Sequence, residues 1–165
     1  MRRTMKNTSS IVLSELLSPG TIALNLKSTT PESVIEELVD QIPQFKNQPE
    51  ERQTLIRALH EREKLHSTGI GDGIALPHAR NALVGLVDRS IIVFGRHPAG
   101  IPFGAIDRIP ARLFFLLIAP TVTQHLGILA RISRVLRDPK LRQGLLNADN
   151  PTTVINLLRE AESKL

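Results

Sequence analysis

The residue with the clearest chemical potential is His78, which directly follows Pro77 at the end of the short apolar run 74–76. An imidazole with a pKa of about 6.5 is largely neutral at cell pH and keeps a free lone pair on one ring nitrogen. Glycines stand just upstream, at positions 69, 71 and 73, and glycine permits the positive φ angles that let backbone amides point at an anion. A histidine on a stiff element beside free amides would be a workable acceptor for a phosphoryl group.

Plainer interpretations of this segment stay open. An isolated histidine is more often a surface residue or a hydrogen-bonded core residue, and the glycines could form only a tight turn. The segment does not match a Walker loop, because no Gly-Lys-Ser/Thr follows it. It does not match a dinucleotide fingerprint either, because the spacing differs and a helical pattern precedes it.

Metal and thiol chemistry have little support. The chain has five histidines and no cysteine, and no two histidines are spaced i, i+4 or form an HExxH motif. This excludes disulfides, zinc–thiolate sites and cysteine nucleophiles, and leaves too few ligands for a metal hydrolase. We therefore expect no metal and no cofactor. The absence of cysteine also fits a reducing compartment, and we expect a cytoplasmic protein.

The formal net charge is +5, and positive charge concentrates in one stretch. This basic stripe comprises Arg131, Arg134, Arg137, Lys140 and Arg142. Three-residue spacing places the first three on one side of a helix. We interpret the stripe as a solvated helix face, with docking of an acidic protein surface as the alternative. Nucleic acid is an unlikely partner, because a chain with five Phe and no Trp or Tyr offers few rings for base stacking.

Apolar periodicity divides the chain into alternating strands and helices. Five segments show helical periodicity, four of them opening on a proline or a capping residue; they begin near Thr30, Pro49, Gln124, Asp138 and Asn150. Four apolar runs have strand length and composition: 21–26, 74–76, 90–94 and 112–118. We expect a loop at 67–73 and a turn at 98–103. In the helix over 124–136 we expect Leu126, Leu129, Ile132, Val135 and Leu136 to face inward.

This order of elements predicts an α/β fold in one domain, with a mixed sheet of about five strands flanked by helices on both faces. The run after Arg112 is apolar on both faces, as in a central covered strand. Residues 1–10 are expected to be a loose polar tail before a domain over 11–165. No apolar run approaches the ~20 residues needed to cross a bilayer, and we expect neither a signal peptide nor membrane insertion.

Residues 62–78 read Arg-Glu-Lys-Leu-His-Ser-Thr-Gly-Ile-Gly-Asp-Gly-Ile-Ala-Leu-Pro-His. This segment resembles the active-site segment of the fructose/mannitol class of enzyme IIA (EIIA type-2). Members of that family are phosphocarriers of the phosphoenolpyruvate-dependent sugar phosphotransferase system. Within the family, the residues of this segment are most similar to the nitrogen-regulatory branch, often called PtsN. Weaker support comes from residues 100–107 and 125–130, where the family has similar segments.

The resemblance implies a role for several residues. His78 matches the phosphorylated histidine, Arg62 an active-site arginine, and His125 a second active-site histidine that can contact the phosphoryl group or orient His78. Asp107 matches a recurring acid that we interpret as a structural turn residue. Arg62 and His125 could instead be solvent-exposed residues near helix ends. The family fold, a mixed sheet flanked by helices, agrees with the pattern of elements.

Two departures from the family pattern bear on partners and on the site. Arginines at 108 and 112 follow Asp107 where the family usually has Asp-x-x-Pro-Val, and Asp72 stands where the nitrogen-regulatory branch often has Asn. Because an acid would repel phosphate, we expect Asp72 to point away from His78.

The leading hypothesis is a regulatory phosphocarrier that is phosphorylated on His78 by an HPr-like protein and signals to a target protein. A second hypothesis is a sugar-specific IIA component that passes the phosphoryl group to a IIB protein. A third is a binding module without phosphotransfer that uses the basic stripe.

Overall fold

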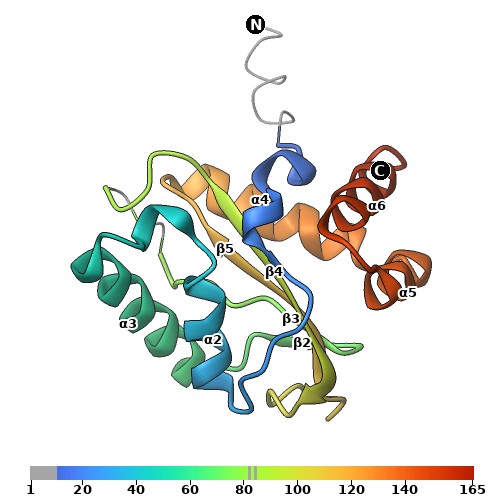
Figure 1. The fold of residues 1–165 in the computed structure, drawn as a ribbon, viewed down its shortest axis with the longest axis horizontal. Coiled ribbons are helices and arrows are strands. Elements are labelled where there is room, and N and C mark those ends of the chain that lie inside the picture. The colour runs from blue at the N-terminus through green and yellow to red at the C-terminus, as the bar shows by residue number, and fades with distance from the viewer. Residues whose placement is uncertain (1–10, 82, 84) are drawn as a thin grey trace, which may run out of the picture.

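The computed structural model describes residues 11–81, 83 and 85–165 (Figure 1). The tail expected over residues 1–10 therefore lies outside the described residues. The helices are α2 (Pro31–Val39), α3 (Pro49–Leu65), α4 (Val122–Val135), α5 (Pro139–Asn147) and α6 (Pro151–Glu162). The strands are β1 (Ile22–Ala23), β2 (Gly69–Gly71), β3 (Ile74–Ala75), β4 (Ile91–Ile101) and β5 (Ala111–Ile118). Short 3₁₀ turns η1 (Leu13–Leu16), η2 (Pro19–Thr21) and η3 (Pro43–Phe45) connect them.

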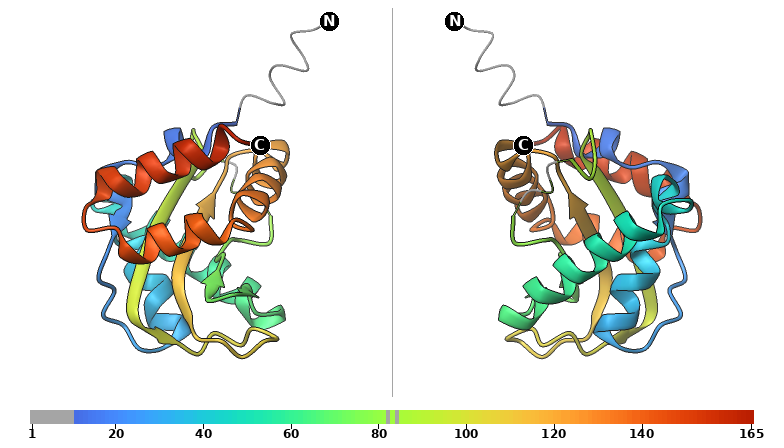
Figure 2. Two further views of the ribbon diagram at one scale, coloured as in Figure 1. Left: turned by 90° about the vertical axis from the view of Figure 1, so that its right-hand side faces the viewer. Right: turned by 90° about the vertical axis from the view of Figure 1, so that its left-hand side faces the viewer.

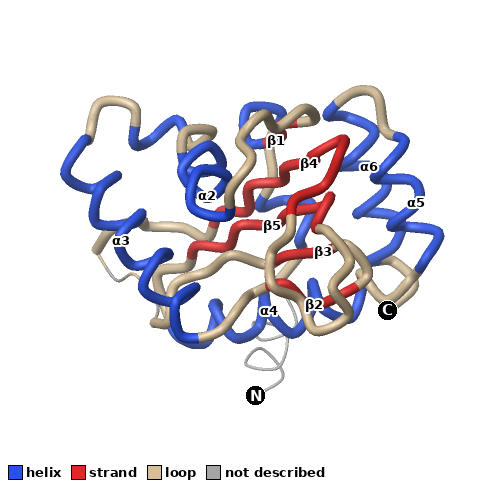
Figure 3. Tube along the Cα trace, turned by 90° about the horizontal axis from the view of Figure 1, so that it is seen from below, coloured by secondary structure: helices blue, strands red, loops and turns tan. Residues whose placement is uncertain are grey.

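The strands form one mixed five-stranded sheet in the order β1-β4-β5-β3-β2 (Figure 3). β1 runs parallel to β4 and β3 parallel to β5, while β4 pairs with β5, and β2 with β3, in the antiparallel sense. α2 and α3 cover one face, and α4, α5 and α6 cover the other (Figures 1 and 2). The predicted fold class, strand number and helical coverage of both faces are confirmed.

Strand β5 shows why both faces are covered. Leu113, Phe115 and Leu117 pack into the core beneath α4–α6, whereas the residues between them pack into the core beneath α2 and α3. Successive strand residues point to opposite faces, so β5, which is apolar at every position after Arg112, requires cover on both faces. None of the described helices is long and apolar enough to cross a membrane.

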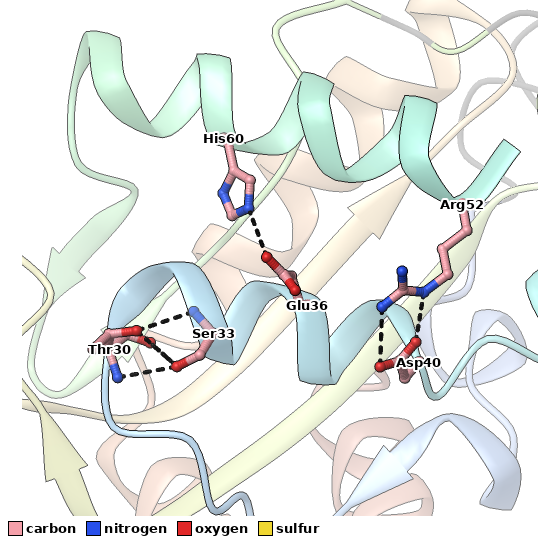
Figure 4. Close-up of polar contacts among 6 residues, drawn as sticks. All are labelled: Thr30, Ser33, Glu36, Asp40, Arg52 and His60. Carbon is pink, nitrogen blue, oxygen red and sulfur yellow. Dashed lines mark hydrogen bonds and ion pairs between the residues drawn. The ribbon is translucent and has the colours of Figure 1, made fainter. Parts of the chain in front are cut away.

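The helix starts agree with their sequence signals. α2, α3, α5 and α6 each have proline at their first position. The Thr30 side chain accepts a hydrogen bond from Ser33 N and closes a capping box (Figure 4). Such caps satisfy the otherwise unpaired amides of a first helical turn.

Two ion pairs connect α2 to α3, as Figure 4 shows. Arg52 Nε lies 2.7 Å from Asp40 Oδ1, and His60 Nε2 lies 3.4 Å from Glu36 Oε2. Partly exposed pairs of this kind contribute little to stability. The apolar residues that α2 and α3 bury together supply most of the packing and orient the carboxyl end of α3, which carries Arg62.

Three details differ from the sequence-based expectation. The expected loop at 67–73 contains strand β2, which pairs with β3, and the first strand is limited to Ile22–Ala23. The expected turn at 98–103 lies largely within β4, because the strand continues through a bulge at Gly100, where φ is +84°. His97 stabilises this bulge: its Nδ1 accepts from Gly100 N and its Nε2 donates to Ser28 O, both at 3.0 Å.

The inward face of α4 also differs. Leu126 was expected inside, but its side chain is 59 % exposed, and His125 is buried instead. Ile128, Ile132 and Val135 continue the buried stripe that His125 begins. Adjacent helical positions are separated by about 100°, so Leu126 points away from the core once His125 occupies the inward position.

Candidate functional site

His78 lies where the chain continues beyond β3 alongside the central strand β5. It forms an isolated parallel bridge with Leu117, and Leu117 N donates to Pro77 O at 3.0 Å. Proline has a fixed φ and no amide hydrogen, which makes this segment rigid. The Pro77 carbonyl is held in place by its hydrogen bond from β5. The half-buried His78 is therefore held beside the middle strand of the sheet.

The tautomer of His78 follows from its hydrogen bond. Nδ1 lies 2.7 Å from Leu76 O, and because a carbonyl can only accept, Nδ1 must carry the hydrogen. Nε2 of the neutral ring then holds the lone pair. Burial is the main cause that lowers the pKa of His78; the Leu76 carbonyl raises this pKa, while the charges of Arg62 and His125 lower it. The neutral form is thus favoured at neutral pH.

The structure brings together the three site residues expected from the resemblance. The rings of His78 and His125 have centroids 5.6 Å apart and are tilted by 55°. Arg62 is near enough for its charge to lower the pKa of His78. Burial also lowers the pKa of His125, which favours a neutral ring there too. These residues come from α4, from the end of α3 and from the segment after β3, which only the tertiary fold joins.

The amino end of α4 adds a favourable field beside the histidines. The Thr121 side chain caps the helix: its Oγ1 accepts a hydrogen bond from Gln124 N at 3.2 Å. His125 is the residue after Gln124 and lies in the first turn of α4. Amides in a first helical turn have no partner within the helix, and the helix dipole is positive at this end. This end of α4 is therefore suited to negative charge on a group bound to His78.

The glycine turn does not serve the role suggested by the sequence. Gly71, Asp72 and Gly73 connect β2 to β3 at the start of β3, whereas His78 follows the other end. The amide of Asp72 is occupied, because it donates to Asp107 Oδ2 at 2.8 Å. The expectation that this loop offers free amides beside His78 is wrong, and Asp72 lies away from His78 because β3 separates them.

Asp107 has the structural role predicted for it. Its carboxylate accepts from the amides of Asp72 and of Ile109, the latter at 3.0 Å. These two hydrogen bonds lower the pKa of Asp107, because they favour the charged form. Asp107 thus ties the loop before β5 to the glycine turn.

Two residues of the site region, Glu63 and Thr68, have no role predicted from the sequence. Glu63 Oε2 accepts from Thr68 N at 2.8 Å, and Glu63 Oε1 accepts from Thr68 Oγ1 at 2.7 Å. Next to Glu63, Arg62 donates to His66 O at 2.5 Å. The last turns of α3 therefore hold the following loop by two side chains. Sequence offers little signal for such contacts, since charged and hydroxyl side chains near a helix end are common on ordinary surfaces.

The basic stripe is not one continuous solvated face. Arg131 Nε lies 2.9 Å from Oε2 of Glu162, whose side chain is buried. Arg142 donates to Leu136 O at 2.8 Å and to Arg137 O at 3.1 Å, at the end of α4. Two of its five members therefore have internal structural partners, and the interpretation as a solvated face holds only for the exposed Arg134, Arg137 and Lys140.

The fold and this cluster of groups define a class of protein. A mixed sheet covered on both faces carries a histidine whose Nδ1 donates to a backbone carbonyl, and an arginine and a second histidine lie near it. Residues 15–161 match the family model described as "Phosphoenolpyruvate-dependent sugar phosphotransferase system, EIIA 2". The chain belongs to this EIIA type-2 family.

Relatives come from both branches of the family. The chain is 35 % identical over 150 residues to the fructose-specific EIIABC component of Bacillus subtilis (strain 168), a match covering 90 % of this chain but 23 % of that longer protein. It is 31 % identical over 160 residues to the nitrogen regulatory protein of Pseudomonas aeruginosa, covering 93 % and 98 % of the two chains. The crystal structure of nitrogen regulatory protein IIA-Ntr from Neisseria meningitidis superposes with a TM-score of 0.78 at 26 % identity, covering 90 % of this chain and 99 % of that one.

Proposed function

We propose that this protein is a phosphoryl carrier in which Nε2 of His78 accepts the group from a phosphorylated HPr-like protein. The observation that carries the proposal is the hydrogen bond between Nδ1 of His78 and Leu76 O. It keeps the hydrogen on Nδ1 and leaves the lone pair on Nε2. Arg62 and His125 lie near the same ring, and both side chains carry N–H groups that can bind phosphoryl oxygens.

The chemical step balances without another reactant. The lone pair of Nε2 attacks phosphorus, an N–P bond to His78 forms, and the N–P bond to the donor histidine breaks. The bonding pair returns to the donor imidazole, whose other ring nitrogen carries a hydrogen, so that the donor ring leaves as neutral imidazole. Nδ1 of His78 keeps its hydrogen during the step, and the product is an N-phosphoimidazolium whose Nδ1–H still donates to Leu76 O. Positioned cations and dipoles stabilise the charge spread over the phosphoryl oxygens, which is the role we assign to Arg62, His125 and the amino end of α4.

The phosphoryl group would act as a charge switch. It adds about 1.5–2 negative charges to the surface at His78, which changes the partner surfaces that can bind there. We propose a regulatory, nitrogen-type role, supported by the match to nitrogen regulatory proteins over almost their full length. The target would be a regulatory protein, and the location would be the cytoplasm, where phosphoenolpyruvate is produced.

The direct test uses labelled phosphoenolpyruvate, enzyme I and an HPr-like carrier. We expect an acid-labile, base-stable label on the wild-type protein and none on His78→Ala, with His66→Ala as a matched control. His66 is exposed and binds Arg62 only through its backbone carbonyl, so its side-chain removal should leave labelling unchanged. Label that persists on His78→Ala would contradict the assignment.

A sugar-specific role is the second candidate, favoured by the fructose-specific relative. In that case the labelled protein should pass its phosphoryl group to a IIB protein at a rate comparable with its own labelling. Failure to transfer to any IIB protein, together with binding to a partner that depends on phosphorylation, would favour the regulatory role.

A further inference from the structure

Glu63 makes the most specific polar contact near the site that the proposed function does not use. Both of its carboxylate oxygens bind one residue, the buried Thr68, through that residue's amide and hydroxyl. A carboxylate that accepts two hydrogen bonds from one residue constrains its position and orientation. Glu63 therefore determines where the chain enters β2 after α3 ends.

A continuous series of hydrogen bonds leads from Thr68 to His78. Thr68 O accepts from Leu76 N at 2.9 Å, and Leu76 O accepts from His78 Nδ1 at 2.7 Å. Leu76 is followed by Pro77, whose own carbonyl is held by Leu117. The direction of the Leu76 carbonyl thus depends on a hydrogen bond to Thr68 on one side and on the rigid proline on the other.

The same contact affects the electrostatics of Arg62. Glu63 is adjacent to Arg62, yet its oxygens are engaged by Thr68. Among residues 11–81, 83 and 85–165, the ion pairs are Arg52–Asp40, His60–Glu36 and Arg131–Glu162, so Arg62 has no carboxylate within pairing distance there. Thr68 keeps the Glu63 carboxylate directed toward the start of β2, and the Arg62 charge stays available to an incoming anion.

We infer that Glu63 is a positioning residue for His78: through Thr68 and Leu76 it holds the carbonyl that keeps the hydrogen on Nδ1 and the lone pair on Nε2. This inference rests on the proposed function for its effect on phosphotransfer. Its effect on the tautomer stands apart from that function, because the imidazole has the same hydrogen-bond partner whether or not a donor protein is present.

The test compares Glu63→Ala with Glu63→Gln in the full chain. Glutamine can accept from Thr68 N through its carbonyl and donate to Thr68 Oγ1 through its amide, so it preserves the geometry without the charge. Glu61→Ala is the matched control, because Glu61 is exposed on the same turn of α3. Thr68→Val removes only the hydroxyl contact and provides a second variant should Glu63→Ala fail to fold.

The main readout is the tautomer of His78 by ¹⁵N NMR, with the rate of labelling by the phosphorylated carrier alongside it. Wild type, Glu61→Ala and Glu63→Gln should show the Nδ1–H form. Glu63→Ala should show mixed tautomers and label about tenfold more slowly, the effect of losing roughly one hydrogen bond, and Thr68→Val should lie between them.

Two results would overturn the inference. One is a folded Glu63→Ala protein with the wild-type tautomer and labelling rate. The other is equal slowing in Glu63→Ala and Glu63→Gln with no change of tautomer, which would assign Glu63 a role through its charge. If the wild type takes no label at all, the proposed function fails, while the tautomer comparison still decides the role of Glu63.

Discussion

At the scale of single residues, the site depends on which ring nitrogen of His78 carries hydrogen and on how easily the ring is protonated. The Leu76 carbonyl decides which ring nitrogen carries the hydrogen. Burial, together with the charges of Arg62 and His125, lowers the pKa of the ring. Nucleophilicity requires the neutral ring, so both effects favour attack by Nε2 at neutral pH.

Removing the charge of Arg62 should have two measurable effects. In Arg62→Ala we expect the pKa of His78 to rise, because the Arg62 charge disfavours the protonated ring. We also expect phosphorylation to slow by about 100-fold, as for the loss of one group that stabilises transition-state charge. An NMR titration of His78 and a labelling time course measure these effects. Arg57→Ala, an exposed arginine on the same helix, should change neither; an unchanged pKa in Arg62→Ala would show that Arg62 acts elsewhere.

The pH profile of labelling should reflect the lowered pKa of His78. A histidine with a lowered pKa stays neutral to a lower pH than usual, so the rate should hold constant down through pH 7. It should fall only as the pH drops through the pKa of His78, with a midpoint below the ordinary value of about 6.5. The rate should be measured with donor already phosphorylated, so that upstream steps do not limit it. A midpoint above 6.5 would contradict the burial seen here.

At the scale of elements, the hairpin of β2 and β3 has a structural contact at one end and the candidate site at the other. The glycine turn is tied to Asp107 at one end, and the other end continues to His78 beside β5. On β4, Arg96 donates to the carbonyls of Leu145, Leu146 and Ala148 and so holds the carboxyl end of α5. We therefore expect the glycine turn to contribute to stability and the segment at His78 to carry the proposed chemistry.

Gly71→Ala tests this separation. Gly71 has a φ of +96°, and a Cβ there would lie 3.0 Å from Asp107 Oδ2. We expect a loss of about 1–3 kcal/mol in the free energy of unfolding from the strained backbone, measured by urea denaturation, with little change in labelling rate of the folded protein. Gly20→Ala is the control, since its Cβ would meet nothing closer than 3.9 Å. A large loss of labelling in folded Gly71→Ala would place the turn in the site after all.

At the scale of the whole molecule, Glu162 connects elements from both ends of the described chain. Its buried carboxylate accepts from the amides of Leu13 at 2.6 Å and Ser14 at 3.1 Å, and it pairs with Arg131 on α4. One side chain near the end of α6 therefore holds η1 and α4, and α4 carries His125. A buried carboxylate is tolerated here because its charge is paired with Arg131 and its oxygens accept hydrogen bonds from two backbone amides.

Glu162→Ala should be strongly destabilising. Removing one partner of a buried ion pair costs about 3–5 kcal/mol, since Arg131 and two amides would lose their acceptor; chemical denaturation monitored by circular dichroism measures the loss. Glu160→Ala, two positions earlier and exposed, is the control and should remain within about 0.5 kcal/mol of wild type. A stability loss equal to that of the control would contradict the role assigned to Glu162.

The sequence by itself determined the α/β class, the covered central strand and the helix starts at Pro31, Pro49, Pro139 and Pro151. Through the family resemblance it also pointed to His78, Arg62 and His125 as candidate site residues. These features are local, because periodicity, capping and a continuous motif act between residues close in the chain. Only the tertiary structure decided that Leu126 faces solvent. It also decided that the glycine turn binds Asp107 and lies away from His78, and that Arg131 forms an ion pair with Glu162. Each of these depends on a contact between residues 30 or more positions apart, or on competition for one place in the core. The hydrogen on Nδ1 of His78 belongs to the same group, since the segment that holds it is positioned by pairing with Leu117 on β5.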